Sequence, residues 1–148
     1  MKVAFFGTSD RSIPILESLN SEFELVLCVT KEDKKVGRKQ QLEETAIKKW
    51  AKKNRVDYFT IAKLDENTTK QLVTKMEENK IEIGVVADFS FILPRKILET
   101  PRLGIVNVHF SLLPKLRGAS PIQHAILGGL EKTGIIHVKN QIHFLINR

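Results

Sequence analysis

The chain has 148 residues, 42% of them hydrophobic and 28% charged, and its formal net charge is +7 at pH 7. This length predicts one domain, residues 1–148, with a substantial buried core, and the composition excludes an intrinsically disordered chain. No apolar run approaches the ~20 residues that a membrane helix needs, and the apolar start ends at Gly7 without a cleavage site. We therefore expect a cytoplasmic protein with no membrane partner.

The expected elements alternate between strands and helices from the first residues. Lys2–Phe6 is typical of a short buried strand, and a helix opens at Ser12–Pro14, where proline is tolerated because it lies in the first turn. Glu24–Thr30 is a second apolar, β-branched segment of strand length. The polar segment Lys31–Gln41 has no periodicity and contains a glycine, which predicts a loop.

The second part of the chain continues this alternation. A helix is predicted from Leu42 onward, because apolar residues up to Ala51 recur at helical spacing and make Trp50 a core or rim residue. Further expected elements are a weak strand at Tyr58–Ile61, a helix at Asp65–Asn79, buried strands at Ile81–Ala87 and Ile105–His109, and a helix at Pro121–Leu127.

Strands that alternate with helices predict an α/β fold, namely a Rossmann-like, open, mostly parallel sheet with helices on both faces. Ligands of such folds bind at the carboxyl ends of strands, beside a topological switch point. Two expected strand ends are rich in polar residues, at Asp88–Ser90 and Asn107–Ser111. Gly7–Asp10 has one glycine, too few for a dinucleotide fingerprint, and predicts only a tight turn.

Few side chains could bind a metal or form a disulfide. The single cysteine, Cys28, lies in an apolar segment without a base, which favours a core thiol over a nucleophile. No Cys/His pair has the spacing of zinc ligands, so no metal site is predicted. The basic segment 31–39 is typical of a solvated loop, but it also suits a polyanion such as RNA.

Asn107 and His109 are two residues apart on an expected strand, so their side chains share one face. Imidazole moves protons near neutral pH, and a carboxamide N–H can donate to an oxygen that gains charge in a tetrahedral intermediate. A structural histidine beside a hydrogen-bonding asparagine fits the same spacing. The pair by itself leaves both interpretations open.

The pair belongs to a longer motif, Asn-x-His-x-Ser-Leu-Leu-Pro-x-x-Arg-Gly-x-x-Pro-Ile-Gln-x-Ala-Ile at residues 107–126. This motif closely resembles the signature of the folate-dependent formyltransferase family. Phe5–Thr8 resembles the opening strand and turn of that family, and Val85–Pro94 resembles the strand that lines its folate pocket. Lys35–Leu42 is similar to a basic insertion of the methionyl-tRNA formyltransferases. The resemblance runs from residue 2 to about residue 135 and implies the formyltransferase fold.

The resemblance also implies a reaction. The formyl group of 10-formyltetrahydrofolate passes directly to the amino group of initiator methionyl-tRNA on a monomeric protein. Asn107 is the implied donor to the oxyanion, and His109 the implied carrier of the proton. The residues implied to contact the folate co-substrate are Phe89, Ser90, Ser111, Leu112, Leu113 and Pro114, and those implied to contact tRNA are Arg38, Lys39 and Arg117.

Several features depart from the family pattern. The aspartate that orients the family's histidine has no counterpart after Asp88, and Ser90 stands where the family prefers glycine. Residues 136–148 form an atypical tail, so we expect an incomplete C-terminal part of the fold and no C-terminal tRNA-binding domain. Besides a methionyl-tRNA formyltransferase, two alternatives stay open: a sugar-amine formyltransferase, and a catalytically impaired remnant that binds folate or RNA.

Overall fold

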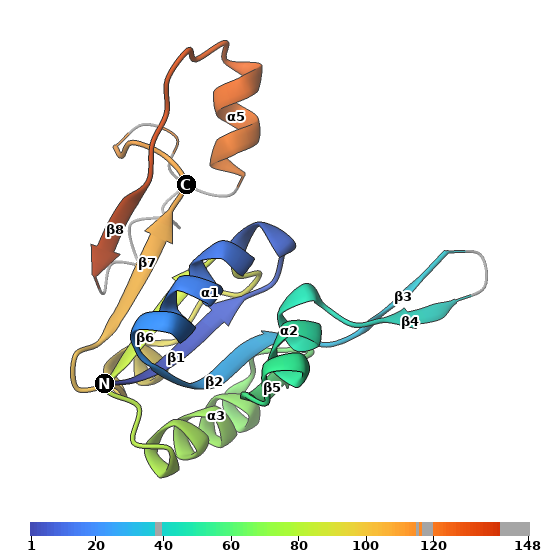
Figure 1. The fold of residues 1–148 in the computed structure, drawn as a ribbon, viewed down its shortest axis with the longest axis vertical. Helices are drawn as coiled ribbons and strands as arrows, with labels where there is room; N and C mark the ends of the chain where they lie inside the picture. Colours follow the sequence, from blue (N-terminus) through green and yellow to red (C-terminus); the bar gives the residue numbers. More distant parts are fainter. Residues whose placement is uncertain (38–39, 115, 117–119, 140–148) are drawn as a thin grey trace.

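The computed structural model describes residues 1–37, 40–114, 116 and 120–139, and within these ranges the chain forms a six-stranded sheet (Figure 1). The strand order is β5-β2-β1-β6-β7-β8, in which β8 is antiparallel to β7 and the other neighbours are parallel. The strands are β1 (Lys2–Gly7), β2 (Glu24–Lys31), β3 (Lys34–Val36), β4 (Gln41–Glu43), β5 (Asp57–Ile61), β6 (Ile83–Ala87), β7 (Ile105–His109) and β8 (Ile136–Lys139). The helices are η1 (Asp10–Ser12), α1 (Ile13–Glu22), α2 (Ala46–Asn54), α3 (Glu66–Glu78), α4 (Arg95–Glu99) and α5 (Pro121–Leu127).

Both faces of the sheet carry helices, which confirms the predicted α/β architecture. One hydrophobic cluster joins the sheet to α1 and α2, and it contains Phe5, Leu16 and Trp50. The other joins the opposite face to α3 and α4, and it contains Phe6 and Ile97. Adjacent residues of β1 therefore enter opposite clusters, as the alternation of side chains along a strand requires.

The centre of the sheet is packed closely enough to require glycine at one position of β6. A Cβ atom at Gly84 would lie 2.8 Å from Cγ1 of Ile105 and 3.3 Å from a ring carbon of Phe6. A larger residue there would push β7 and β1 aside, because protein interiors hold few voids into which a side chain can move. Gly84 thus allows three neighbouring strands to pack on the α3 face.

The segment predicted as a loop, Lys31–Gln41, contains strand structure instead. Lys31 ends β2, and β3 and β4 then form a separate antiparallel ribbon that projects away from the sheet (Figure 1). Gly37 has a φ of 71°, which favours glycine at the turn. The ribbon escaped prediction because β4 is exposed along its whole length, so no buried face creates a periodic pattern.

The predicted start of the next helix was also wrong. Leu42 lies in β4 with an exposed fraction of 68%, and α2 begins only at Ala46. Thr45 caps this helix, since its Oγ1 accepts a hydrogen bond from the Lys48 backbone N–H at 3.1 Å. The capping threonine marks the boundary more reliably than the apolar spacing, which Leu42 matches by coincidence.

Three short elements had no sequence prediction: η1, α4 and β8. The first two are too short for helical periodicity to be visible. Strand β8 covers the start of the segment 136–148, which the sequence led us to expect as an atypical tail, and its Ile136 pairs with His109 of β7. The predicted Asp65–Asn79 helix is confirmed as α3, whose Asp65 side chain accepts from the Thr68 backbone N–H at 2.9 Å.

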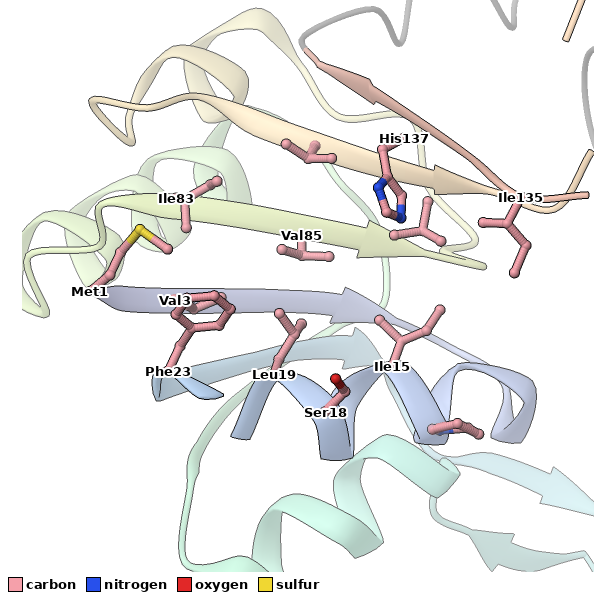
Figure 2. A pocket seen from close by; sticks show the side chains of 13 residues that line it. Met1, Val3, Ile15, Ser18, Leu19, Phe23, Ile83, Val85, Ile135 and His137 are labelled. Carbon is pink, nitrogen blue, oxygen red and sulfur yellow. The ribbon is translucent and has the colours of Figure 1, made fainter. Parts of the chain in front are cut away.

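An apolar pocket of about 500 Å³ lies between α1 and the β6–β7–β8 side of the sheet. Figure 2 shows Ile15 and Leu19 of α1 on one side and His137 of β8 on the other. Val106 and Val108 of β7 also line it, so the pocket is on the face opposite to the odd-numbered residues of β7. Among the described residues, no helix has the length and hydrophobicity to cross a membrane.

The Glu82 carboxylate ties the amino end of β6 to its neighbours and makes a pH dependence predictable. It accepts from Arg102 at 2.6 Å and from the Lys2 backbone N–H at 2.8 Å, and these bonds, in that order, lower its pKa below the ordinary 4.5. A carboxylate whose pKa is lower in the folded than in the unfolded chain stabilises the fold at any pH above its unfolded-state pKa. This stabilisation disappears as the pH falls through the folded-state pKa. Glu82→Gln is therefore expected to lower the melting temperature at neutral pH.

The difference between wild type and Glu82→Gln should shrink towards zero in acid, which melting curves between about pH 7 and pH 2 will show. Glu99→Gln, which changes an exposed carboxylate on α4, is the control. A difference that is constant over this range would contradict the assignment of the shift to Glu82.

Candidate functional site

The order in which strands follow one another in the sheet changes direction at β1. Strands β2 and β5 extend the sheet from one side of β1, and β6 and β7 extend it from the other. The carboxyl ends of β1 and β6 therefore form the topological switch point, where ligands of open α/β sheets bind. The predicted polar segment Asp88–Ser90 follows β6 at this place.

Hydrogen bonds join the two strand ends at the switch point. The Thr8 backbone N–H donates to the Asp88 carbonyl at 3.0 Å, and the Ser90 backbone N–H donates to Thr8 Oγ1 at 3.1 Å. The Asp88 carboxylate accepts from Ser9 Oγ and from Arg11 Nη2, the latter at 2.7 Å. Asp88 has a φ of 50°, a left-handed conformation that is uncommon for a residue with a side chain and that often occurs at functional sites.

Phe89 and Ser90, which the resemblance assigns to folate, lie beside the Asp88 turn. Phe89 is half-buried, with its ring edge-on to Phe6 at a centroid distance of 5.7 Å and tilted against Phe91 at 5.5 Å. Ser90 is exposed. The turn thus presents an aromatic ring that is supported from behind by the core, next to a polar residue at the surface.

Asn107 and His109 share a face of β7, as the spacing predicted. Ile105 enters the cluster under α3 and α4, whereas Val108 enters the cluster under α1 and α2. Strand alternation therefore places Asn107 and His109 on the α3 face, the face on which Phe89 packs. Asn107 is half-buried, and His109 is buried with an exposed fraction of 6%.

A backbone carbonyl orients the buried imidazole. His109 Nε2 lies 3.2 Å from the Leu116 carbonyl oxygen, which also accepts from Ser111 Oγ at 3.4 Å. A carbonyl oxygen can only accept, so this contact assigns the proton to Nε2 and leaves Nδ1 as the acceptor of the neutral ring. The carbonyl takes a position like that of the carboxylates that orient histidines elsewhere, but it carries no charge to stabilise an imidazolium.

The Ser111–Pro114 turn continues from β7. Ser111 is fully buried, Leu113 is half-buried, and Leu112 and Pro114 are exposed. A Cβ atom at Gly134 would lie 2.6 Å from Cδ2 of Leu112, so the segment before β8 passes close against the turn. The turn therefore packs against the segment that leads into β8, whose first residue, Ile136, pairs with His109.

The described residues include only sequence neighbours of the residues expected to contact tRNA. Arg38, Lys39 and Arg117 lie outside the described residues. Their neighbours Lys34 and Lys35 are exposed on β3, and the exposed Glu43 of β4 lies opposite Lys34, so the described part of the projecting ribbon carries a small net positive charge. Exposed lysines of this kind can contact nucleic-acid phosphates.

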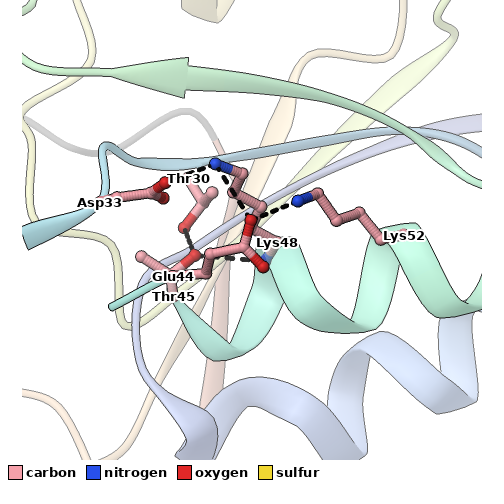
Figure 3. A network of polar contacts seen from close by, with 6 residues as sticks. All are labelled: Thr30, Asp33, Glu44, Thr45, Lys48 and Lys52. Carbon is pink, nitrogen blue, oxygen red and sulfur yellow. Dashed lines mark hydrogen bonds and ion pairs between the residues drawn. The ribbon is translucent and has the colours of Figure 1, made fainter. Parts of the chain in front are cut away.

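Other lysines beside the ribbon are neutralised locally. Figure 3 shows Lys48 between Asp33 and Glu44, at 2.6 and 3.4 Å, with Lys52 also bound to Glu44. The pKa of Lys48 is raised, mostly by its hydrogen bond to Asp33 and to a smaller extent by its hydrogen bond to Glu44. The pKa of Glu44 is lowered, chiefly by its bond to Lys52. These lysines are internally paired, and the ribbon is the better candidate for a polyanion.

The predicted core thiol is confirmed. Cys28 is fully buried, and burial, with a smaller effect of the Asp57 charge, raises the pKa of its thiol to about 12. Such a thiol supplies no thiolate at neutral pH. Among the described residues, no group of three or more His, Cys, Asp or Glu side chains could hold a metal ion.

The matching family is named Formyl transferase, and its model matches residues 1–145 of this chain. The chain belongs to the formyl transferase family. It is 43% identical over 136 residues to the methionyl-tRNA formyltransferase of Bacillus mycoides (strain KBAB4), which covers 91% of this chain and 42% of the relative. The corresponding protein of Clostridioides difficile (strain 630) is 40% identical, with coverages of 91% and 43%. The chain thus spans about two-fifths of the length of these curated relatives.

Solved structures of the family share the fold. The phosphoribosylglycinamide formyltransferase of Bacillus halodurans superimposes with a TM-score of 0.75 at 20% identity, over 94% of this chain and 71% of that chain. The enzyme of the same name from Streptococcus pneumoniae TIGR4 gives a TM-score of 0.73 at 23% identity, over 92% and 71%. At these identities the likeness is evidence for the fold alone.

Sequence reasoning missed two parts of the site. Ser9 and Arg11 bind the Asp88 carboxylate, although Asp88 lies almost eighty positions further along the chain. The Leu116 carbonyl, a backbone group, orients His109. The only available signal was the polar character of both strand ends, because no local pattern reports a contact across the sheet.

Proposed function

We propose that this formyl transferase domain transfers the formyl group of 10-formyltetrahydrofolate to the amino group of methionyl-tRNA. The observation that carries the proposal is the joint placement of Asn107, His109 and Phe89 on one sheet face, at the carboxyl edge beside the switch point. The names of the relatives at 40–43% identity support methionyl-tRNA as the acceptor.

The proposed reaction is a direct acyl transfer. The amine nitrogen attacks the formyl carbon, the bond from that carbon to the folate nitrogen breaks, and a proton passes from the amine to the leaving nitrogen. Asn107 donates to the developing oxyanion, and the acceptor nitrogen of His109 moves the proton. Phe89 provides a flat apolar surface for the pterin, and Ser90 and the Ser111–Pro114 turn form the rest of the proposed folate wall.

The acceptor assignment rests on the basic ribbon β3–β4. Lys34 and Lys35 are exposed there, and Arg38 and Lys39 follow in the sequence. Contacts between such side chains and tRNA phosphates would make binding strongly dependent on salt. A sugar-amine acceptor makes no use of the ribbon, so replacing Lys34 and Lys35 with alanine would leave its turnover unchanged.

The test is transfer of labelled formyl from 10-formyltetrahydrofolate to initiator methionyl-tRNA, with an amino-sugar nucleotide as a parallel acceptor. Transfer to tRNA that weakens in the Lys34→Ala/Lys35→Ala variant, but not in Lys52→Ala, supports the proposal. Transfer to the amino sugar alone, or no transfer at high protein concentration, contradicts it.

One observation favours a second candidate, namely folate binding without turnover. His109 is oriented by a neutral carbonyl, and loss of a carboxylate from a histidine-based site can lower the rate by about 10⁴. A ligand that binds only the native state stabilises it by about 2.7 kcal/mol at a hundredfold excess over Kd, or ~5–10 °C for a chain of this size. A melting shift with 5-formyltetrahydrofolate, together with absent transfer, would establish this candidate.

A further inference from the structure

Arg11 connects the Asp88 turn of the candidate site to helix α5. Its guanidinium Nη2 donates to the Asp88 carboxylate at 2.7 Å, which fixes it to the end of β6. With the Gln123 carboxamide oriented so that its oxygen faces the guanidinium, Nη1 donates to that oxygen at 3.1 Å. One planar group thus reaches from the switch point to helix α5.

In the part of the chain that the structure describes, helix α5 (Pro121–Leu127) is mostly exposed. It has seven residues, fewer than an isolated helix needs for stability, and among them only Ala125 is buried. Ile126 and Leu127 have exposed fractions of 73% and 83%. A short helix with so little buried apolar surface opens easily, and a polar tether therefore has a large influence on its position.

Asp88, one of the two residues that Arg11 connects, has an unusual backbone conformation. Its left-handed backbone turns the chain so that Phe89 faces Phe6 and the Ser90 N–H reaches Thr8. Ser9 and Arg11 both bind its carboxylate and so hold this turn closed. A change at Arg11 therefore acts on α5 and on the Phe89–Ser90 surface together.

We propose that Arg11 is a positioning residue that holds helix α5 in a fixed position relative to the Asp88–Ser90 turn. Arginine is required because its planar fork donates to two acceptors on different sides, whereas a lysine ammonium acts as a single point charge. The inference deepens the proposed function, and its folate part rests on that function. The coupling of α5 to Arg11 can be measured without any ligand.

The experiment compares wild type, Arg11→Ala, Arg11→Lys and Gln123→Ala, with Arg102→Ala as the matched control. Arg102 makes an ion pair of similar length, 2.6 Å to Glu82, at the other end of the sheet. Hydrogen exchange of peptides that cover residues 120–130 reports the opening of α5, melting temperature reports global stability, and 5-formyltetrahydrofolate is the binding probe.

Arg11→Ala is expected to speed exchange in α5 and to weaken 5-formyltetrahydrofolate binding about tenfold. Arg11→Lys should restore the melting temperature but not the protection of α5, and Gln123→Ala should add nothing to Arg11→Ala in the double variant. Arg102→Ala should change neither α5 exchange nor binding.

Unchanged α5 exchange in Arg11→Ala would overturn the inference, whatever happens to folate binding. Equal losses in Arg11→Ala and Arg102→Ala would also overturn it, because they would show a general effect on stability. If wild type binds no folate, the proposed function fails, while faster α5 exchange in Arg11→Ala alone would still support the tether.

Discussion

Replacing His109 with alanine is expected to lower the rate of formyl transfer by about 10²–10⁴, the usual contribution of a positioned acid–base group. The contact of Nε2 with the Leu116 carbonyl leaves Nδ1 as the nitrogen of the buried imidazole that can accept a proton. Alanine removes both nitrogens, so the amine would have to lose its proton to water. Initial rates with 10-formyltetrahydrofolate and methionyl-tRNA measure the effect.

Two further variants separate chemistry from folding. His109→Gln keeps a donor for the Leu116 carbonyl but cannot carry a proton, so it should fold normally and still be impaired. His137→Ala alters an exposed histidine in the pocket on the other sheet face and should keep full activity. Equal rates for wild type and His109→Gln would disprove a proton-transfer role for His109.

Replacing Phe6 with alanine is expected to lower the free energy of unfolding by about 3–5 kcal/mol. The side chain is fully buried between the sheet and α3, and it supports the ring of Phe89 from behind. Its removal leaves a cavity, and the close approach of β6 and β7 at Gly84 limits how far the strands can collapse into it. Urea denaturation followed by circular dichroism measures the change.

Phe23→Ala is the matched control, because Phe23 has an exposed fraction of 42% at the edge of the apolar pocket. Phe23→Ala should lower the free energy of unfolding clearly less than Phe6→Ala does, since it removes less apolar surface from the interior. Similar losses of unfolding free energy in the two variants would contradict the placement of Phe6 at the centre of the core. A stable Phe6→Ala variant would also lose folate affinity, because Phe89 would lose its support.

The strands of the central sheet were predictable because burial on both faces selects continuous apolar segments. Glu24–Thr30 and Ile105–His109 were recognised with bounds within one residue of β2 and β7. The ribbon β3–β4 was not, because exposed strands need no apolar residues and its pairing depends on a turn at Gly37. Leu42 shows the reverse error, an apolar residue at helical spacing that lies exposed on a strand.

The sequence by itself determined the family, the α/β alternation and the candidate pair Asn107 and His109, because these depend on local patterns and a contiguous motif. Only the tertiary structure showed that the Leu116 carbonyl orients His109 and that Arg11 connects Asp88 to Gln123. The physical reason is that such contacts join residues through the geometry of the sheet edge. The energy of these contacts depends on distance and orientation in space, which cannot be predicted from the spacing of residues along the chain.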